Sequence, residues 1–449
     1  MKRFFNARTS VLRQPLPTGR YRYVRRRWRL LFTIVDGVGE LLAAWKSRLA
    51  RLRVPAERSV EPVRSILLVQ LDHLGDALLT AAVLPDLRRR FPKSRIEVLG
   101  TPWNREVFEA APEVDRVHLS KWNRFAGGWR PGWLLATLAW GWRLRGRFDV
   151  AIDVRGEFPQ AALVWLSGAR RRVGWDCGGG GFLLTDHAEF VPGRPEIESR
   201  LTLLALLGVQ PGRRLLQKRP WFDPGDDARS RMIHRLREVD EHRRLLIVLH
   251  IGGGSQAKRW PAAHWQELLG RITAEYDAAI VLVGSRSERH WARAITAGHP
   301  WPGVTDWTGQ LSLRETAALT ERADVLIGPD SGPAHLAAAI GAAAIVLFSG
   351  TNRVRQWRPW GRRVAVVRNH TICSPCHRRT CPLADHPCMN GLTPEAVMRQ
   401  LRRVLASSVV ADAGAPLTRA IAGLHADLPQ PARMIHLPTL TRSASEDRQ

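Results

Sequence analysis

Short apolar runs alternate with amphipathic stretches along most of the chain, from about residue 64 to about residue 406. The first run is SILLVQL (65–71), and similar runs near residues 95, 115 and 148 are separated by stretches with helical periodicity. A second alternation starts with LLIVLHIGGGS (245–255) and continues through AIVLVG, DVLIGPDSG and AIVLF. Such runs predict buried parallel strands, and the stretches between them predict helices. We therefore expect an α/β fold with two Rossmann-like, doubly wound domains and a cleft between them.

One predicted βαβ unit, VLIGPDSGPAHLAAAIGAAAIVLFSG (325–350), contains the most distinctive turn. The turn GPDSGP (328–333) follows a strand and begins a helix, with Asp330 or Ser331 as the cap. The first amides of a helix have no intrahelical partner, so they favour an anion such as a phosphate or a carboxylate. An ordinary capped helix in a parallel sheet would show the same pattern, so this turn alone does not decide between the two.

The ends of the chain differ from the alternating part. Residues 1–60 are strongly basic and contain an apolar stripe with spacings of three and four residues: Trp28, Leu31, Val35, Val38, Leu42 and Trp45. A basic amphipathic helix of this kind suits a membrane interface, although Asp36, Gly37 and Gly39 weaken it and the stripe could equally dock on the protein's own surface. Residues 61–225 and 226–406 then form the two domains. Residues 407–449, rich in Ala, Pro, Ser and Thr, predict a disordered tail.

The charge of the chain narrows the kind of partner. The formal net charge is +27 and the pI is about 11.4, far beyond what solubility requires. We expect an anionic partner, such as a nucleotide, a phosphorylated glycan or an acidic membrane surface. Arginine outnumbers lysine, which suits bidentate contacts with phosphate, although a GC-rich genome would give the same bias. Specific nucleic-acid binding is not expected, because no reader motif with interleaved aromatic residues is present.

Four of the five cysteines lie in one short segment: Cys373, Cys376, Cys381 and Cys388. Four close thiols in a reducing compartment suggest a structural zinc site or, with less support, an iron–sulfur site. Free thiols and incidental pairing are the alternatives. No continuous apolar run follows the basic N-terminus or reaches the length of a transmembrane helix, so we expect a cytoplasmic protein without a cleavable signal.

Two turns at predicted strand ends carry groups suited to phosphate and sugar chemistry. Gly75 and Asp76 begin a helix after the first strand, where Asp76 could act as a general base or simply complement the helix dipole. In the second half, Gly252-Gly253-Gly254-Ser255 allows close backbone approach, while Lys258 and Arg259 supply positive charge. Walker, G-x-G-x-x-G and tight D-x-D motifs are all missing. A diphosphate would thus be neutralised by side chains and helix termini, and catalysis would require no cofactor.

In combination, several of these motifs resemble glycosyltransferase family 9, whose best-known members are the ADP-heptose:lipopolysaccharide heptosyltransferases. The motifs are DHLGDALLT (72–80), the glycine turn with KRWP (258–261), Thr308-Gly309 with the helix after it, and GPDSGPAHLAAA (328–339). The resemblance covers roughly residues 64–406 and implies a GT-B fold with two Rossmann-like domains facing across the cleft. It implies an inverting transfer from a nucleotide-sugar donor, ADP-heptose, to lipopolysaccharide core or another anionic lipid-linked glycan. The enzyme would then work peripherally on the cytoplasmic face of the cell membrane.

The resemblance also assigns roles to residues. The family's catalytic aspartate matches Asp76, and its phosphate-binding lysine matches Lys258. The further donor-side matches are Asp330, Ser331, Gly332, His335 and, more loosely, Glu288 for the nucleoside hydroxyls. His335 could equally serve only to pack its helix. No role for the cysteine segment is carried over from the family.

Two other functions stay open at this point. A nucleotide-sugar epimerase of GT-B fold would use a similar cleft without a lipid-linked acceptor. A non-catalytic protein that binds nucleic acid or another anionic polymer would use the basic surface and the cysteine segment.

Overall fold

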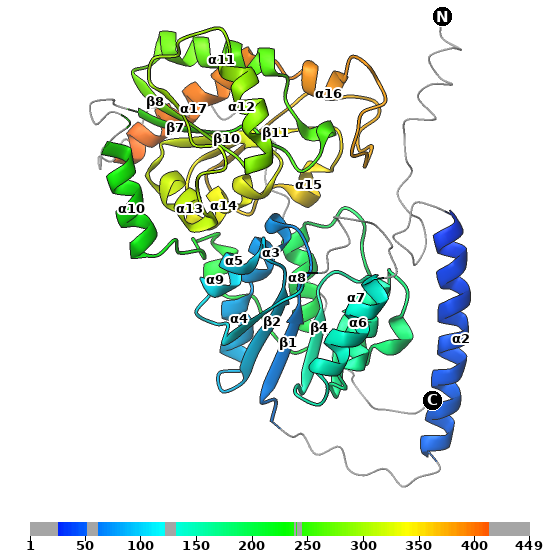
Figure 1. Cartoon of the computed structure of the whole chain (residues 1–449). Coiled ribbons are helices and arrows are strands. Elements are labelled where there is room, and N and C mark those ends of the chain that lie inside the picture. The colour runs from blue at the N-terminus through cyan, green and yellow to red at the C-terminus, as the bar shows by residue number, and fades with distance from the viewer. Residues whose placement is uncertain (1–25, 52–61, 122–131, 238, 240–244, 413–449) are drawn as a thin grey trace, which may run out of the picture. The chain divides into compact units, whose positions relative to one another are not determined.

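The computed structural model describes residues 26–51, 62–121, 132–237, 239 and 245–412 (Figure 1). The described residues up to Leu405 belong to one compact unit, which contains two six-stranded sheets. All strand pairs in both sheets are parallel. The two alternations in the sequence therefore correspond to two doubly wound sheets, as predicted. The exact boundary between the two predicted domains stays a prediction.

The first sheet has the strand order β3-β2-β1-β4-β5-β6. Its strands are β1 (Ser65–Val69), β2 (Arg95–Gly100), β3 (Arg116–Leu119), β4 (Val150–Asp153), β5 (Arg171–Trp175) and β6 (Asp186–Ala188). The helices of this half are α3 (Leu74–Ala81), α4 (Leu84–Arg90), α5 (Arg105–Glu109), α6 (Gly132–Arg143), α7 (Phe158–Leu166), η2 (Gly181–Leu183), α8 (Glu196–Ala205) and α9 (Arg213–Leu216). The chain order reverses between β1 and β4, so a crevice is expected beyond the carboxyl ends of these two strands.

The second sheet repeats this topology with the order β12-β11-β10-β7-β8-β9. Its strands are β7 (Leu245–His250), β8 (Ala278–Val283), β9 (Val304–Asp306), β10 (Val325–Pro329), β11 (Ala344–Phe348) and β12 (Val364–Arg368). The helices are α10 (Asp226–Arg237), η3 (Gln256–Lys258), α11 (Ala262–Glu275), η4 (Arg286–Glu288), α12 (Arg289–Thr296), α13 (Leu313–Arg322), α14 (Gly332–Ile340), α15 (Val354–Trp357), α16 (Pro387–Asn390) and α17 (Pro394–Asp412). Here the order reverses between β7 and β10.

Two helix boundaries differ from the sequence prediction. The helical periodicity over residues 77–91 predicts one helix, but the structure has two, α3 and α4, because Pro85 lies in the first turn of α4 and cannot occupy a helix interior. α17 continues to Asp412, so the start of the tail predicted from residue 407 is helical. The rest of that tail lies outside the described residues.

α2 (Arg26–Arg51) is the basic amphipathic helix expected near the N-terminus. It lies against the first half through one seam, in which Phe32, Asp36 and Gly39 are buried. The backbone amide of Gly180 donates a 2.7 Å hydrogen bond to Asp36 Oδ1. A Cβ added at Gly39 would lie 2.4 Å from the ring of Phe182, so only glycine allows this close approach.

The predicted stripe of α2 lies mainly on another face, because Leu31, Val38, Leu42 and Trp45 are exposed. The docking seam is thus a different set of residues from the stripe. In the part of the chain that the structure describes, neither α2 nor any other helix combines the length and the apolar character needed to cross a bilayer.

Candidate functional site

A cavity of about 740 Å³ is lined by residues from both sheets. On the first sheet, its walls come from the segments that follow β1 and β4. On the second sheet, they come from the segments that follow β7 and β10. These are the two points at which the strand orders reverse, where parallel α/β sheets bind their ligands.

Most of the predicted site residues meet in this cavity. Those that line it are Gly75, Asp76, Gly253, Gly254, Ser255, Lys258, Glu288, Asp330, Ser331, Gly332 and His335. Arg259 does not line it, although it follows Lys258 directly. Its predicted contact with a phosphate stays a prediction.

Close contact between α3 and α14 brings the two halves of the site together. A Cβ at Gly75 would lie 2.9 Å from Cδ2 of His335, and a Cβ at Gly332 would lie 2.7 Å from Cδ2 of Leu74. Each helix therefore has a glycine in its first turn where the other helix needs space. This packing places Asp76, in the first turn of α3, beside the N-terminus of α14.

Asp76 is a buried carboxylate held by an arginine of α8. The guanidinium of Arg200 donates to Asp76 Oδ1 at 2.8 Å, and both side chains are almost fully buried. Burial alone would raise the pKa of Asp76, but the nearby positive charges, first those of Arg200 and Arg155, outweigh it and lower that pKa. Asp76 is therefore ionised near neutral pH, as a general base must be.

Arg200 is in turn connected to the second half. It forms an ion pair with Glu196, one helical turn earlier on α8. The other carboxylate oxygen of Glu196, Oε1, accepts a 2.8 Å hydrogen bond from the side-chain amide of Gln356 on α15. Three side chains thus connect Asp76 to the second sheet's side of the cavity.

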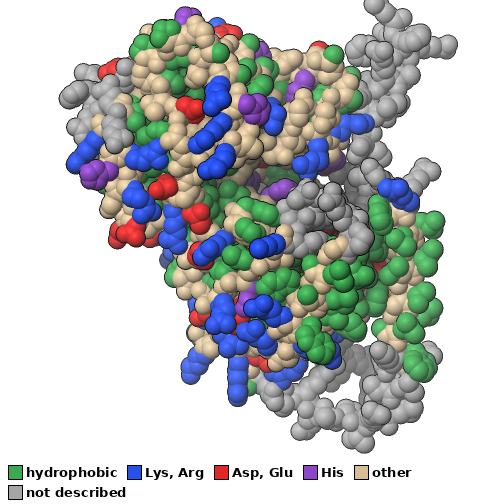
Figure 2. All heavy atoms as spheres, viewed as in Figure 1, with side chains coloured by type: hydrophobic (Ala, Val, Ile, Leu, Met, Phe, Trp, Pro, Cys, Tyr) green, Lys and Arg blue, Asp and Glu red, His purple; other side chains and the backbone are tan. Residues whose placement is uncertain are grey.

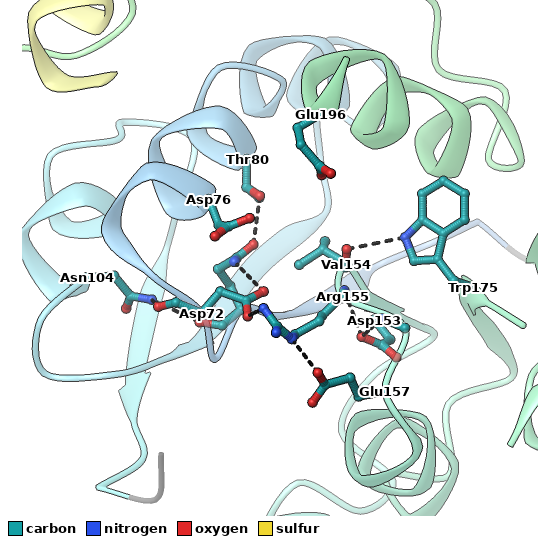
Figure 3. A network of polar contacts seen from close by, with 12 residues as sticks. Asp72, Asp76, Thr80, Asn104, Asp153, Val154, Arg155, Glu157, Trp175 and Glu196 are labelled. Carbon is teal, nitrogen blue, oxygen red and sulfur yellow. Dashed lines mark hydrogen bonds and ion pairs between the residues drawn. The ribbon is translucent and has the colours of Figure 1, made fainter. Parts of the chain in front are cut away.

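A second buried carboxylate, Asp72, lies near Asp76 and is drawn with its partners in Figure 3. Arg155 forms an ion pair with it, and the Gln70 side chain donates to Asp72 Oδ2 at 3.2 Å. Burial is the largest effect on Asp72 and raises its pKa to about 6, against the charge of Arg155. A carboxylic acid with this pKa changes its protonation state close to physiological pH.

Asp153, at the end of β4, supports the turn that carries Arg155. Its Oδ1 accepts the backbone amides of Arg155 and Gly156 at 2.9 and 3.0 Å. Its Oδ2 is buried and has no hydrogen-bond partner. Burial raises the pKa of Asp153 to about 7. The carboxyl therefore fixes the turn rather than acting in the cavity, which it does not line.

The N-terminus of α14 is open towards the cavity. Ser331 occupies the cap position, but its side chain does not cap the helix, and the first turn contains no acidic residue. The Ser331 hydroxyl instead lies 3.1 Å from Nδ1 of His250. Burial lowers the pKa of His250 and of His335, so both rings are neutral at pH 7. An anion would find backbone amides and a positive dipole end here.

Lys258 reaches the same place from the glycine-rich turn after β7. Its Nζ donates to the carbonyl oxygen and to Oδ2 of Asp330, both at 2.9 Å. The Asn352 side chain donates a further 2.8 Å hydrogen bond to Asp330 Oδ2. Asp330 therefore positions the ammonium group beside the start of α14. The sequence predicted Asp330 as a helix cap or as a contact of the nucleotide-sugar donor. Its role in orienting Lys258 was not predicted.

Glu288 holds the glycine-rich turn from the other side. Its Oε1 accepts the Gly253 amide at 3.1 Å, and its Oε2 accepts the Ser285 amide at 2.7 Å. A Cβ at Gly252 would overlap the Glu288 carboxylate, which explains the glycine at that position. Glu288 lines the cavity, so it remains accessible to a ligand hydroxyl.

Sequence reasoning gave no role to Arg155, Glu196, Arg200 and Asn352. Arg155 had a usable signal, because it follows a predicted strand at its carboxyl end. Glu196 and Arg200 had none, since they lie on a helix 120 residues or more beyond Asp76 and meet it only in the fold.

The four clustered cysteines are free thiols, and only Cys388 is fully buried. Burial raises the pKa of Cys376 and Cys388, and the neighbouring thiols raise it further, so the segment brings these side chains near one another. Within the described residues, however, no group of three or more His, Cys, Asp or Glu side chains is arranged to hold a metal ion. The metal expected from the cysteine spacing stays a prediction.

Comparison with known proteins gives one matching family. Residues 138–386 match the model of glycosyltransferase family 9 (heptosyltransferase). Lipopolysaccharide heptosyltransferase 3 of Escherichia coli is 25% identical over 300 residues, covering 65% of this chain and 84% of that protein. Lipooligosaccharide heptosyltransferase 2 of Haemophilus ducreyi is 24% identical over 352 residues, covering 76% of this chain and 99% of that protein.

Solved structures show the same fold. A glycosyltransferase family 9 protein from Veillonella parvula superposes with a TM-score of 0.65 at 18% identity, covering 77% of this chain and 98% of its own. ADP-heptose LPS heptosyltransferase II of E. coli gives a TM-score of 0.62 at 20% identity, with 77% and 99% covered. An E. coli heptosyltransferase solved with ADP-2-deoxy-2-fluoro heptose gives 0.56 at 20% identity, with 76% and 99% covered. The fold is therefore GT-B, as predicted.

Proposed function

The chain belongs to glycosyltransferase family 9, and we propose that it transfers heptose from ADP-heptose to an anionic lipid-linked glycan such as lipopolysaccharide core. One observation carries this proposal. A buried, ionised carboxylate (Asp76) and a phosphate-type anion site (Lys258 with the N-terminus of α14) line the same cavity from opposite sheets. These are the two groups that a glycosyl transfer needs.

The mechanism follows from where negative charge is lost and gained. An acceptor hydroxyl is a poor nucleophile until a base removes its proton, and Asp76 is the carboxylate placed to accept that proton. The new bond forms between this oxygen and the anomeric carbon, while the bond to the diphosphate breaks. The departing nucleoside diphosphate takes the bonding electrons, and Lys258 with the Ser331 and Gly332 amides stabilises them. A single displacement of this kind inverts the anomeric configuration.

The choice of donor is supported by what relatives bind. An E. coli heptosyltransferase of this fold has been solved with ADP and with ADP-2-deoxy-2-fluoro heptose. Glu288, at the edge of the glycine-rich turn, is a suitable partner for the nucleoside hydroxyls. Neutralisation of the diphosphate by Lys258 and helix amides means that the transfer step requires no metal. No step in this proposal involves the cysteine segment. For that segment we predict about one equivalent of bound zinc or iron, which metal analysis of freshly purified protein would measure.

The acceptor and the location are proposed from charge. A net charge of +27 favours a phosphorylated, membrane-borne acceptor, and the enzyme would reach it as a peripheral protein on the cytoplasmic face of the cell membrane.

The test combines donor binding with transfer. We expect ADP to raise the melting temperature in magnesium and in EDTA alike, whereas GDP, UDP and dTDP do so less. Lys258→Ala should remove this shift, and Lys93→Ala, an exposed lysine far from the cavity, should leave it unchanged. Asp76→Asn should lower kcat by roughly a thousandfold with donor binding kept. Equal shifts with every nucleotide, or turnover that survives in Asp76→Asn, would contradict the proposal. Epimerisation of the donor without any acceptor would instead indicate an epimerase.

A further inference from the structure

Large apolar side chains are concentrated on one part of the surface. Of the seventeen that the described residues expose, seven lie on α2, four on α6 and one on α7. The most exposed are Trp142 at 76% and Leu41 at 73%. Six of these side chains define what we call the apolar surface: Ile34, Leu41 and Trp45 of α2, Leu135 and Trp142 of α6, and Trp165 of α7.

The three helices of this surface are neighbours. α6 packs along α7, and α2 contacts both η2 and the start of α7, where the rings of Phe32 and Phe158 lie 5.6 Å apart. Figure 2 shows hydrophobic side chains gathered over α6 and along α2 on the same side of the molecule. The seam of Phe32, Asp36 and Gly39 faces the protein, so the exposed residues of α2 face away from it.

The charged residues on the helices of this surface are mainly basic, which suits contact with anions. α2 contains six Arg or Lys residues, grouped near its two ends, and only two acidic residues. One of these, Asp36, is buried and bonded to the Gly180 amide, which leaves Glu40 as the exposed one. α6 has no acidic residue and ends at Arg143; two residues later, the guanidinium of Arg145 lies over the Trp142 ring.

We propose that α2 and α6 together dock this protein on an anionic bilayer, with both helices lying in the headgroup region and neither crossing it. Exposed tryptophans with flanking arginines fit the boundary between headgroups and acyl chains, where an amphipathic side chain keeps its polar atoms in water. Lipid headgroups supply the negative charge that the arginines require. A second copy of this chain would place the same basic helix ends against each other, so charge favours the bilayer as the occupant.

Two helices on one body act as linked contacts. Once α2 is inserted, α6 is held close to the bilayer, and its contact becomes an intramolecular event. Each helix should therefore strengthen binding by more than its isolated affinity. The docking surface belongs to the same half as Asp76. Docking would therefore present the acceptor side of the enzyme to the membrane, and this part of the inference rests on the proposed function.

The test is co-sedimentation of the full chain with two kinds of vesicle. One contains phosphatidylcholine alone, and the other contains roughly 30% phosphatidylglycerol, which supplies anionic headgroups. We expect binding to the anionic vesicles that weakens at high salt. Changing Leu41 and Trp45 to Gln should weaken it roughly tenfold, and changing Leu135 and Trp142 to Gln should do the same. The matched control changes Leu216 and Ile233 to Gln, because these exposed apolar residues lie on α9 and α10, away from the surface. It should bind as the unchanged protein does.

Each other outcome overturns a stated part of the proposal. Full binding by the Leu135 and Trp142 variant would remove α6 from the docking surface. Equal binding to neutral and anionic vesicles would show that the arginines do not contribute to membrane binding. A concentration-dependent dimer, abolished by the same substitutions in protein that does not bind vesicles, would make the surface a contact between copies. The ADP-induced thermal shift of the unchanged protein is measured in parallel. A shift without vesicle binding would contradict only the docking proposal, and vesicle binding without a shift would contradict only the proposed function.

Discussion

Asp76 illustrates what a single residue reveals in sequence and what it reveals only in the fold. Its place after a buried strand and at the start of a helix was enough to predict a carboxylate at the mouth of a crevice. Its partner, Arg200, lies 124 positions away in sequence, so no local pattern indicates the pair. The same holds for Lys258, whose glycine-rich turn was visible but whose contact with Asp330 spans 72 positions.

Replacing Arg200 by Gln should change the pH dependence of transfer. The charged groups around Asp76 are Arg200, Arg155 and the second carboxylate Asp72, while His73 and His335 also lie nearby. Arg200 has the largest lowering effect of the positive charges, so its removal raises the pKa of Asp76. A base is inactive when protonated, so the acidic limb of the kcat/KM profile should move to higher pH. At pH 7 we expect kcat/KM to fall by roughly tenfold, because the carboxylate also loses its positioning contact.

Glu196→Gln is combined with this change so that Glu196 is not left as a second buried carboxylate without its counterion. Arg213→Gln, at an exposed arginine of α9, serves as the control and should leave the profile unchanged. An acidic limb that stays in place in the double variant, with the melting temperature preserved, would show that Arg200 has only a structural role.

At the scale of elements, α2 shows how periodicity identifies a helix and yet misses its docking seam. Spacings of three and four residues predicted the helix and its exposed stripe. The seam contains Asp36 and Gly39, residues that weaken an isolated helix and therefore counted against it in the sequence. Their value comes from the Gly180 amide and the Phe182 ring, and both lie more than 140 residues further along the chain. Tertiary contact thus overrides local propensity here.

Gly37 and Gly39 provide a matched pair on this helix. Gly37→Ala has no atom within 4 Å of its new Cβ, so it should stabilise α2 by about 0.5–1 kcal/mol. Gly39→Ala would place its Cβ 2.4 Å from the Phe182 ring and should release the helix from η2. Hydrogen exchange of α2 in the full chain measures both effects. Equal protection in the two variants would show that the seam does not hold α2 in place.

At the scale of the molecule, alternation predicted both sheets, but the way the two halves contact each other was beyond sequence reasoning. One hydrophobic cluster includes Leu78 of α3 and Leu336 of α14, so the core continues from one half to the other. Trp221, in the connection between the halves, donates from its indole to the Leu78 carbonyl and from its backbone to the Ala339 carbonyl. The Pro, Gly and charged residues around Trp221 are typical of an interdomain connection, and such a composition carries no information about these contacts.

This continuity predicts that donor binding stabilises both halves at once. If the core is shared, the described unit should unfold in a single urea transition, and ADP at a hundred times its Kd should add about 2.7 kcal/mol to the free energy of unfolding. Hydrogen exchange should then slow in α3 as well as in α14, although ADP is expected to contact only the second half. Trp221→Ala should uncouple the two responses, since it removes the side chain that bonds to α3, whereas Lys258→Ala should abolish both. Two separate transitions, with the effect of ADP confined to the transition of the second half, would show that the halves are energetically independent. The proposed transfer would then depend on ligands alone to bring Asp76 and Lys258 together.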